Sequence, residues 1–209
     1  MALVSLLGKT ALVTGGACRV GRSISLALAR TGCNIIVHYN SSLDSAQSTV
    51  QEIESLGVSA FPIQADLTNR LQIQALADQV LSVCSGSLDL LVHNAANFER
   101  VAPDSLDESA WDRALTLNTT AAYLLSVALS QALRNARGSV VGIGCLSALK
   151  PWKNYLPYSV SKAAFVHLIK GLALTLAPQA RANVILPGTV QAPSDFDPVL
   201  IETIRQKAP

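Results

Sequence analysis

Short apolar runs alternate with longer segments of helical periodicity along the whole chain. The runs TALVT (10–14) and SVVGI (139–143) are apolar on both faces, which is typical of parallel strands covered by helices on either side. The predicted strands are 10–14, 34–38, 59–64, 88–93, 139–143 and 183–186. The predicted helices are 20–31, 44–56, 70–84, 109–135 and 157–177.

This alternation predicts the fold. Strand, helix and strand in repeated order indicate right-handed crossovers and a doubly wound parallel sheet. We therefore expect an α/β protein of the Rossmann type, with a sheet between two helical layers (αβα). No linker or internal repeat divides the sequence, so residues 1–209 are predicted to form one Rossmann-type domain.

Composition narrows the class of partner. Half of the residues are hydrophobic, 14% are charged, and 16 Lys and Arg against 14 Asp and Glu give a net charge of +2. This composition argues against a disordered chain and against nucleic acid or an anionic membrane as partner. The four cysteines form no CxxC pair and show no zinc spacing. With neither a signal peptide nor an uninterrupted apolar span, a cytoplasmic protein with free thiols, no metal site and no membrane segment is predicted.

A glycine-rich turn follows the first predicted strand. Its sequence is Thr-Gly-Gly-Ala-Cys-Arg-Val-Gly from position 14 to 21, and a predicted helix comes next. A strand, a glycine turn and a helix N-terminus make an anion site, because amides and the helix dipole favour negative charge. A tight corner without a ligand is the alternative interpretation.

The end of the second strand bears on the choice of cofactor. The residues there are Tyr39, Asn40, Ser41 and Ser42. NAD-binding folds usually place a carboxylate at this point to bind the ribose 2′-hydroxyl, but the first one here is Asp44. The two serines can donate hydrogen bonds to a phosphate, and Arg19 can add charge. We therefore expect NADPH rather than NADH, and we expect one of the serines also to cap the next helix.

Tyr158 and Lys162 lie four residues apart in Tyr-Ser-Val-Ser-Lys, on one face of a predicted helix. A free phenol has a pKa of about 10. A neighbouring ammonium is expected to lower that pKa, so that the phenol can exchange a proton. Such a pair also occurs by chance on surfaces, and its position after the fifth strand gives it weight.

Together these motifs resemble the short-chain dehydrogenase/reductase family over nearly the whole chain. The resemblance implies hydride transfer between nicotinamide C4 and a carbonyl or imine carbon. By it, Tyr158 is the acid/base, Lys162 binds the nicotinamide ribose and lowers the tyrosine pKa, and Asn118 holds a water in the proton relay. The implied cofactor contacts are Gly15, Arg19, Val20, Gly21, Tyr39, Asn40, Ser41, Ser42, Asp66, Leu67, Asn94, Ala95, Ala96, Lys162, Pro187 and Gly188.

One branch of the family, the pteridine reductases, is more similar to this chain. Arg19 stands at the second motif glycine, as it does in that branch, and the pair His38-Tyr39 also matches. Phe98 occupies the place of a phenylalanine that stacks on the pterin, and Tyr155 that of an active-site tyrosine. Stacking of this kind contributes about 0.5–1.5 kcal/mol beyond burial. Phe98, Tyr155 and Arg19 are therefore the predicted substrate contacts.

Several positions depart from the family pattern. Cys145 stands 13 residues before Tyr158, where the family has Ser and the pteridine reductases have Asp, and a thiol is a weak donor. Ser147 would face the same side if the chain were extended there, so it could substitute. A weakened or altered enzyme is favoured over a reactive thiolate at Cys145. In addition, His93 replaces an Asn, and Ala192 replaces a Thr that usually meets the nicotinamide carboxamide.

Two further expectations concern the end of the chain and its assembly. Family members continue past a segment like 204–209 with one more helix and an edge strand, so the fold is expected to lack both, whether as a fragment, a variant or a shorter form. Helices 109–135 and 157–177 are apolar nearly all round. In the family they form a four-helix interface, so a homodimer or homotetramer is predicted.

Three functions remain open from the sequence. The first is an NADPH-dependent reductase of a dihydropteridine or another planar carbonyl or imine substrate. The second is a general carbonyl or 3-oxoacyl reductase of the same family. The third is a catalytically weakened nucleotide-binding protein that serves as a scaffold or redox sensor, to which Cys145 and the short C-terminus point.

Overall fold

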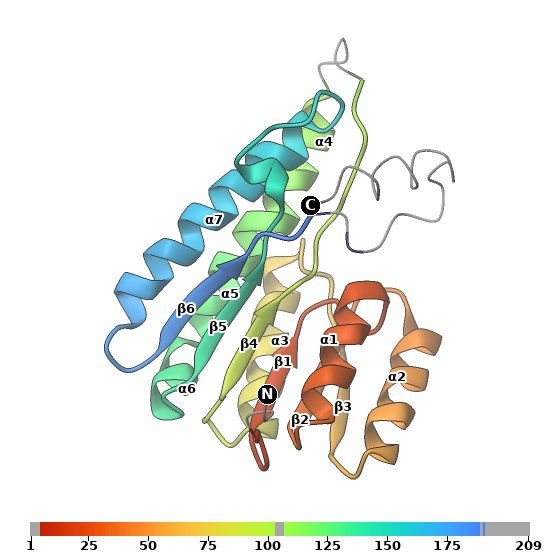
Figure 1. Cartoon of the computed structure of the whole chain (residues 1–209), viewed down its shortest axis with the longest axis vertical. Helices are drawn as coiled ribbons and strands as arrows, with labels where there is room; N and C mark the ends of the chain where they lie inside the picture. Colours follow the sequence, from red (N-terminus) through yellow and green to blue (C-terminus); the bar gives the residue numbers. More distant parts are fainter. Residues whose placement is uncertain (1–4, 103–106, 189, 191–209) are drawn as a thin grey trace.

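A computed structural model of the chain describes residues 5–102, 107–188 and 190. Its six strands form one sheet in the order β3-β2-β1-β4-β5-β6, with every neighbouring pair parallel. This order confirms the doubly wound Rossmann-type sheet (Figure 1). The strands are β1 (Thr10–Val13), β2 (Asn34–Tyr39), β3 (Ala60–Gln64), β4 (Leu90–His93), β5 (Ser139–Ile143) and β6 (Arg181–Ile185).

Helices cover both faces because alternate strand residues point to opposite sides of the sheet. Leu12 belongs to the core beneath the helices that follow β3, whereas Ala11 and Val13 belong to the core beneath α1 and α2. Figure 1 shows α1 and α2 packed side by side, apart from α5 and α7. The helices are α1 (Arg19–Ala29), α2 (Leu43–Ser55), α3 (Arg70–Val83), α4 (Glu108–Leu115), α5 (Ala121–Ala128), α6 (Ser130–Asn135) and α7 (Leu156–Leu176).

The predicted helix 109–135 is not continuous. A π-helical turn, η1 (Thr116–Thr120), separates α4 from α5, and Leu129 separates α5 from α6. Polar contacts from η1 to α7 accompany the break, since Thr119 Oγ1 donates to the Ser161 carbonyl at 2.9 Å. A π turn inserts one extra residue and re-aims the side chains within it. As a result Asn118 faces the buried side of the helix and is 2% exposed.

Helix α7 is long and apolar enough, by length and composition, to cross a membrane. It packs instead against α4, β5 and β6. Tyr158, Lys162 and Phe165 on its inner side are buried. Helix α7 is therefore a core helix that packs on the sheet, and this accounts for its apolar composition.

The described part of the sheet ends at β6 (Figure 1). Alternate residues of β6 are exposed, and Ile185 is 55% exposed. Residues 204–209, on which the expectation of a shortened end rests, lie outside the described residues.

Candidate active site

The glycine turn between β1 and α1 is held by hydrogen bonds to a buried histidine of β2. The Gly15 amide donates to His38 Nδ1 at 3.0 Å, and the Gly16 amide donates to the His38 carbonyl at 2.9 Å. These two amides therefore face β2 and are not part of the outward-pointing set that the sequence led us to expect. The amides left for an anion belong to residues 17–21, at the start of α1.

The close packing of this turn explains two of its residues. A Cβ on Gly21 would lie 1.9 Å from the Gly15 carbonyl oxygen, so no side chain fits there. Gly15 has a φ of 61°, in the left-handed region that glycine adopts at little cost. Arg19 adopts the same region with a φ of 50°, so it keeps the left-handed conformation where the family has a glycine.

An open pocket of about 440 Å³ lies between the N-terminal ends of α1 and α2. It is lined by Ala17, Cys18, Arg19, Arg22, Asp44, Ser45 and Ser48. The pocket adjoins the predicted cofactor turn and brings Arg19 and Arg22 together with two hydroxyl groups of α2. Arg22 also forms an ion pair with Glu52. Sequence reasoning missed Arg22, Ser45 and Ser48, although the two serines are three apart on one helix face.

The predicted serines lie just outside this lining. Ser41 and Ser42 are exposed, and neither belongs to the pocket walls. Ser42 occupies the N-cap position of α2, but its side chain makes no capping hydrogen bond. The expectation that a serine hydroxyl caps this helix is therefore wrong, because the Ser42 backbone (φ −92°, ψ 60°) departs from the extended conformation usual for a cap.

On the other side of the turn, Asn94 fixes the glycine loop to β4. Its Nδ2 donates to the carbonyls of Thr14 (3.0 Å) and Gly15 (3.2 Å). Thr14 Oγ1 accepts in return from the amides of Asn94 (3.0 Å) and Ala95 (3.1 Å). Asn94 and Ala95 thus lie beside the turn. The Asp66 carboxylate binds the amide and hydroxyl of Thr68 at 2.8 and 2.7 Å, which orders the loop after β3.

Tyr158 and Lys162 are both buried in the first turns of α7, with 9% and 4% exposure. Lys162 Nζ donates to the Ile143 carbonyl at 3.0 Å and lies 5.8 Å from the centre of the Tyr158 ring. Burial lowers the pKa of Lys162 to about 8. The amino group therefore remains largely protonated at neutral pH.

The Tyr158 phenol does not have the lowered pKa that the sequence suggested. Burial raises its pKa above the ordinary value, and the neighbouring Cys145 thiol raises it further. The Lys162 ammonium is directed at the Ile143 carbonyl, and the cost of burying a phenolate outweighs its attraction. In this structure Tyr158 is a neutral phenol, which can donate a proton.

Asn118 joins the loop after β4 to α7. Its Oδ1 accepts from the Asn97 amide at 2.9 Å, and its Nδ2 donates to Ser161 Oγ at 2.9 Å. Ser161 Oγ donates in turn to the Tyr158 carbonyl at 2.7 Å. This chain of bonds ties Asn118 to the turn that bears the phenol. Asn97 Oδ1 is buried and has no hydrogen-bond partner among the described residues.

Cys145 ends the chain segment that follows β5 and is 6% exposed. A 3₁₀ turn, η2 (Leu146–Ala148), begins directly after it, so the chain is not extended there. The argument that Ser147 faces the same side as Cys145 is therefore wrong. The Ser147 amide donates to Cys145 Sγ at 3.4 Å, whereas Ser147 Oγ is buried without a partner in the described part of the chain.

The segment after β6 approaches the same point. The Leu146 amide donates to the Pro187 carbonyl at 3.2 Å. A Cβ on Gly188 would lie 3.6 Å from the Leu146 side chain. Pro187 and Gly188 thus lie beside the Cys145 turn, while the Ala192 substitution falls outside the described residues.

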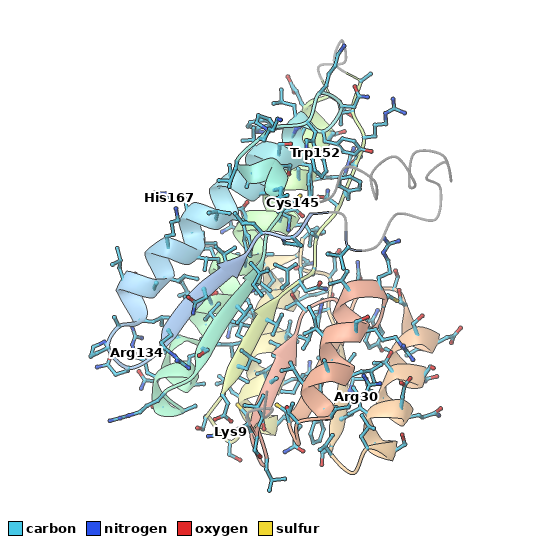
Figure 2. The ribbon with its side chains drawn as sticks, viewed as in Figure 1. Lys9, Arg30, Arg134, Cys145, Trp152 and His167 are labelled. Atoms are coloured by element: carbon cyan, nitrogen blue, oxygen red, sulfur yellow. The ribbon has the colours of Figure 1, made fainter. Side chains whose placement is uncertain are left out.

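Four aromatic rings cluster at the N-terminal end of α7. Phe98 stacks on Tyr155 with ring centres 4.4 Å apart and planes 8° apart, and it meets Tyr158 edge-on at 4.9 Å. Trp152 contacts Phe98 and Tyr155 edge-on at 6.2 and 6.1 Å. Figure 2 shows Trp152 and Cys145 at the α7 side of the sheet. Sequence reasoning missed Trp152, whose position three residues before Tyr155 was the available signal.

Comparison with known proteins agrees with this geometry. A model of the short chain dehydrogenase family matches residues 9–197. The chain belongs to the short-chain dehydrogenase family. It is therefore an oxidoreductase of that family, and the resemblance seen in the sequence is confirmed.

Relatives within the short-chain dehydrogenases carry different names. Glucose 1-dehydrogenase 2 of Bacillus subtilis (strain 168) is 32% identical over 196 residues, which are 92% of this chain and 76% of that protein. The 3-oxoacyl-[acyl-carrier-protein] reductase FabG of Staphylococcus aureus (strain Mu50) is 31% identical, covering 95% of this chain and 80% of its own. FolM alternative dihydrofolate reductase 1 of Brucella canis, solved in complex with NADP, is 31% identical with a TM-score of 0.90, covering 98% and 81%.

Proposed function

We propose that this protein is an NADPH-dependent reductase that delivers hydride to a carbonyl or imine carbon of a planar, pteridine-like substrate. The observation that carries the proposal is the buried Tyr158–Lys162 pair directly beside an aromatic cluster formed by Phe98, Trp152 and Tyr155. The similar FolM alternative dihydrofolate reductase of Brucella canis, which holds NADP, supports both parts of the assignment.

The residues around the glycine turn fit a phosphorylated dinucleotide. The backbone contact between Gly21 and Gly15 leaves no room for a Cβ, as at the last glycine of a dinucleotide-binding turn, where helix and strand pack closely. The polar lining of the adjoining pocket consists of two arginines and two serines beside one carboxylate: Arg19, Arg22, Ser45, Ser48 and Asp44. Guanidinium groups and hydroxyls together favour a ribose 2′-phosphate over a bare 2′-hydroxyl.

NADPH, when bound, supplies the hydride, and the protein supplies the proton. Tyr158 is placed to give it, because the buried phenol is neutral and still carries its proton. Lys162 keeps a positive charge near the face of the Tyr158 ring. Cys145 lies next to the phenol and is the nearest candidate to hydrogen-bond the substrate, although a thiol donates weakly.

A second candidate is reduction of a 3-oxoacyl thioester or a general carbonyl compound. The FabG relatives favour it. So does the stacking of Tyr155 on Phe98, which closes one face of the ring on which a pterin would otherwise stack. Under this alternative the aromatic cluster only packs the segments after β4 and before α7 together, and it makes no contact with the substrate.

The test is a screen for NADPH consumption with dihydropteridines, quinones, small aldehydes and a 3-oxoacyl thioester. Substitution Phe98→Leu should reduce turnover of dihydropteridines much more than turnover of the thioester. Tyr158→Phe should abolish turnover of every substrate and leave NADPH binding intact. NADPH binding without any turnover would instead support the catalytically weakened nucleotide-binding protein.

Self-association is also part of the proposal. Tyr123 and Val127 of α5 are about half exposed, and Leu174 of α7 is 83% exposed. Apolar side chains exposed on these two helices favour burial against another copy. We expect a homodimer or homotetramer through α5 and α7, working in the cytoplasm with its four cysteines free. Light scattering that shows a clean monomer at micromolar concentration would contradict it.

A further inference from the structure

His38, the fifth residue of β2, joins three segments through one side chain and one carbonyl. Its Nδ1 accepts from the Gly15 amide at 3.0 Å, and its Nε2 lies 3.0 Å from the Ala65 carbonyl. Its own carbonyl accepts from the Gly16 amide at 2.9 Å. The ring is 2% exposed. Since β2 lies between β1 and β3 (Figure 1), this residue bridges the loops that follow both neighbours.

These contacts fix the state of the imidazole. An Nδ1 that accepts an N–H bond carries no proton, so the proton resides on Nε2 and is donated to the Ala65 carbonyl. Burial lowers the pKa of His38 to about 4, and the ring is therefore neutral at physiological pH. A neutral histidine in this tautomer serves both partners at once.

All three joined segments belong to the expected binding groove for the adenosine half of the cofactor. Gly15 and Gly16 form the pyrophosphate turn, Ala65 directly precedes Asp66 and Leu67, and His38 itself precedes Tyr39. From the opposite side, Asn94 holds the Gly15 carbonyl at 3.2 Å. The glycine turn is thus clamped between a histidine of β2 and an asparagine that follows β4.

We propose that His38 is a positioning residue for the cofactor: its imidazole sets the spacing between the glycine turn and the loop after β3, and thereby the shape of the groove that receives the adenosine diphosphate moiety. This role rests on the proposed use of NADPH. It predicts that loss of the imidazole weakens cofactor binding and leaves the hydride and proton transfers at Tyr158 intact, because Tyr158 lies on α7, away from these contacts.

The test compares His38→Leu, His38→Gln and wild type. Leucine fills a similar volume but leaves the Gly15 amide and the Ala65 carbonyl unpaired, so the dissociation constant and KM for NADPH should rise about tenfold or more. The kcat at saturating NADPH should stay within about twofold of wild type. Glutamine offers an acceptor and a donor on one amide and should recover most of the affinity.

Asn34→Ala is the matched control. Asn34 lies at the opposite end of β2 and also ties this strand to the β3 side, since its Oδ1 accepts from the Ser59 amide at 3.0 Å. This variant should lower the unfolding temperature modestly without changing the NADPH dissociation constant. NADPH binding is measured by titration of its fluorescence, and each variant is checked by circular dichroism at the temperature of the titration.

Each outcome decides a specific point. Weakened NADPH binding with preserved kcat and rescue by glutamine supports the role. Unchanged binding in folded His38→Leu overturns it, as does an equal loss of kcat and affinity in both His38 variants, which would indicate general damage to the fold. A wild-type protein that binds no NADPH overturns the proposed function and this role together, so the two failures are distinguishable.

Discussion

Exchange of one sulfur atom for oxygen at Cys145 tests whether the thiol limits catalysis. Cys145 is 6% exposed at the end of the β5 segment, and its side chain interacts with the Tyr158 phenol. Cys145→Ser preserves the shape of the side chain and replaces a weak S–H donor by a hydroxyl. The serine can still accept from the Ser147 amide, which now donates to the sulfur at 3.4 Å.

The size of the effect follows from hydrogen-bond energetics. A hydroxyl that donates to the developing negative charge on the substrate stabilises the transition state by about 0.5–1.5 kcal/mol more than a poor donor. This range corresponds to roughly a 2- to 10-fold increase in kcat. Burial, the main cause of the raised pKa of Tyr158, is unchanged by this substitution, so the phenol remains neutral.

The assay is steady-state NADPH oxidation with the best substrate from the screen, beside Cys84→Ser as control. Cys84 is another buried cysteine, 8% exposed at the end of α3, whose sulfur lies near the Leu81 carbonyl at 3.9 Å. Its substitution should leave kcat unchanged. If Cys145→Ser lowers kcat while the unfolding temperature is preserved, the thiol is an adapted part of the site and the reasoning is refuted.

Four further predictions address other groups. Tyr158→Phe should lower kcat by about 100-fold or more with unchanged NADPH affinity; substantial residual turnover would contradict the proton-donor role. Since the lowered pKa of Lys162 is about 8, the ammonium is lost as pH rises through that value, and kcat/KM should fall above it; a profile that stays flat well above pH 8 would oppose this. Burial lowers the pKa of His38 to about 4 and that of His93 to about 3. Both rings are neutral in the folded protein, so protonation below the unfolded pKa of 6.5 favours the unfolded state. The unfolding temperature should therefore drop as pH falls from 6.5 toward 4, and a constant unfolding temperature over that range would contradict this. Gly21→Ala should abolish NADPH binding, because its Cβ would lie 1.9 Å from a carbonyl oxygen of the turn; wild-type affinity in calorimetry would disprove the packing argument.

The strands were the most predictable part of the fold. All six lie within about two residues of their predicted bounds, because runs that are apolar on both faces leave few alternatives in a chain of this length. The break of the predicted helix 109–135 was not predictable. That segment is apolar nearly all round, so its pattern says nothing about backbone geometry, and the π turn η1 is accompanied by contacts to Ser161, distant in sequence.

Spacing along the chain predicted which site residues share a face but not their electrostatics. Tyr158 and Lys162 are one helical turn apart, and they share a face of α7 as the spacing predicted. Their burial was not predicted, because the same spacing also occurs in surface pairs. The pKa of the phenol depends on how deeply α7 packs and on the position of the Cys145 thiol. Both are tertiary features. The same holds for the glycine turn, whose first two amides bind His38, a partner that no local motif specifies.

The aromatic cluster limits how a flat substrate can bind. The sequence identified Phe98 and Tyr155 as separate substrate contacts. In the structure their rings stack on each other, with ring centres 4.4 Å apart and nearly parallel planes. This spacing is that of two rings in direct contact, so a third ring cannot lie between them unless they separate. Tyr158 and Trp152 meet Phe98 only through edge contacts, and Phe98 remains 37% exposed. A planar substrate must therefore either displace Tyr155 or stack on the remaining surface of Phe98, and Tyr155→Ala separates these routes: it should improve binding in the first case and weaken it in the second.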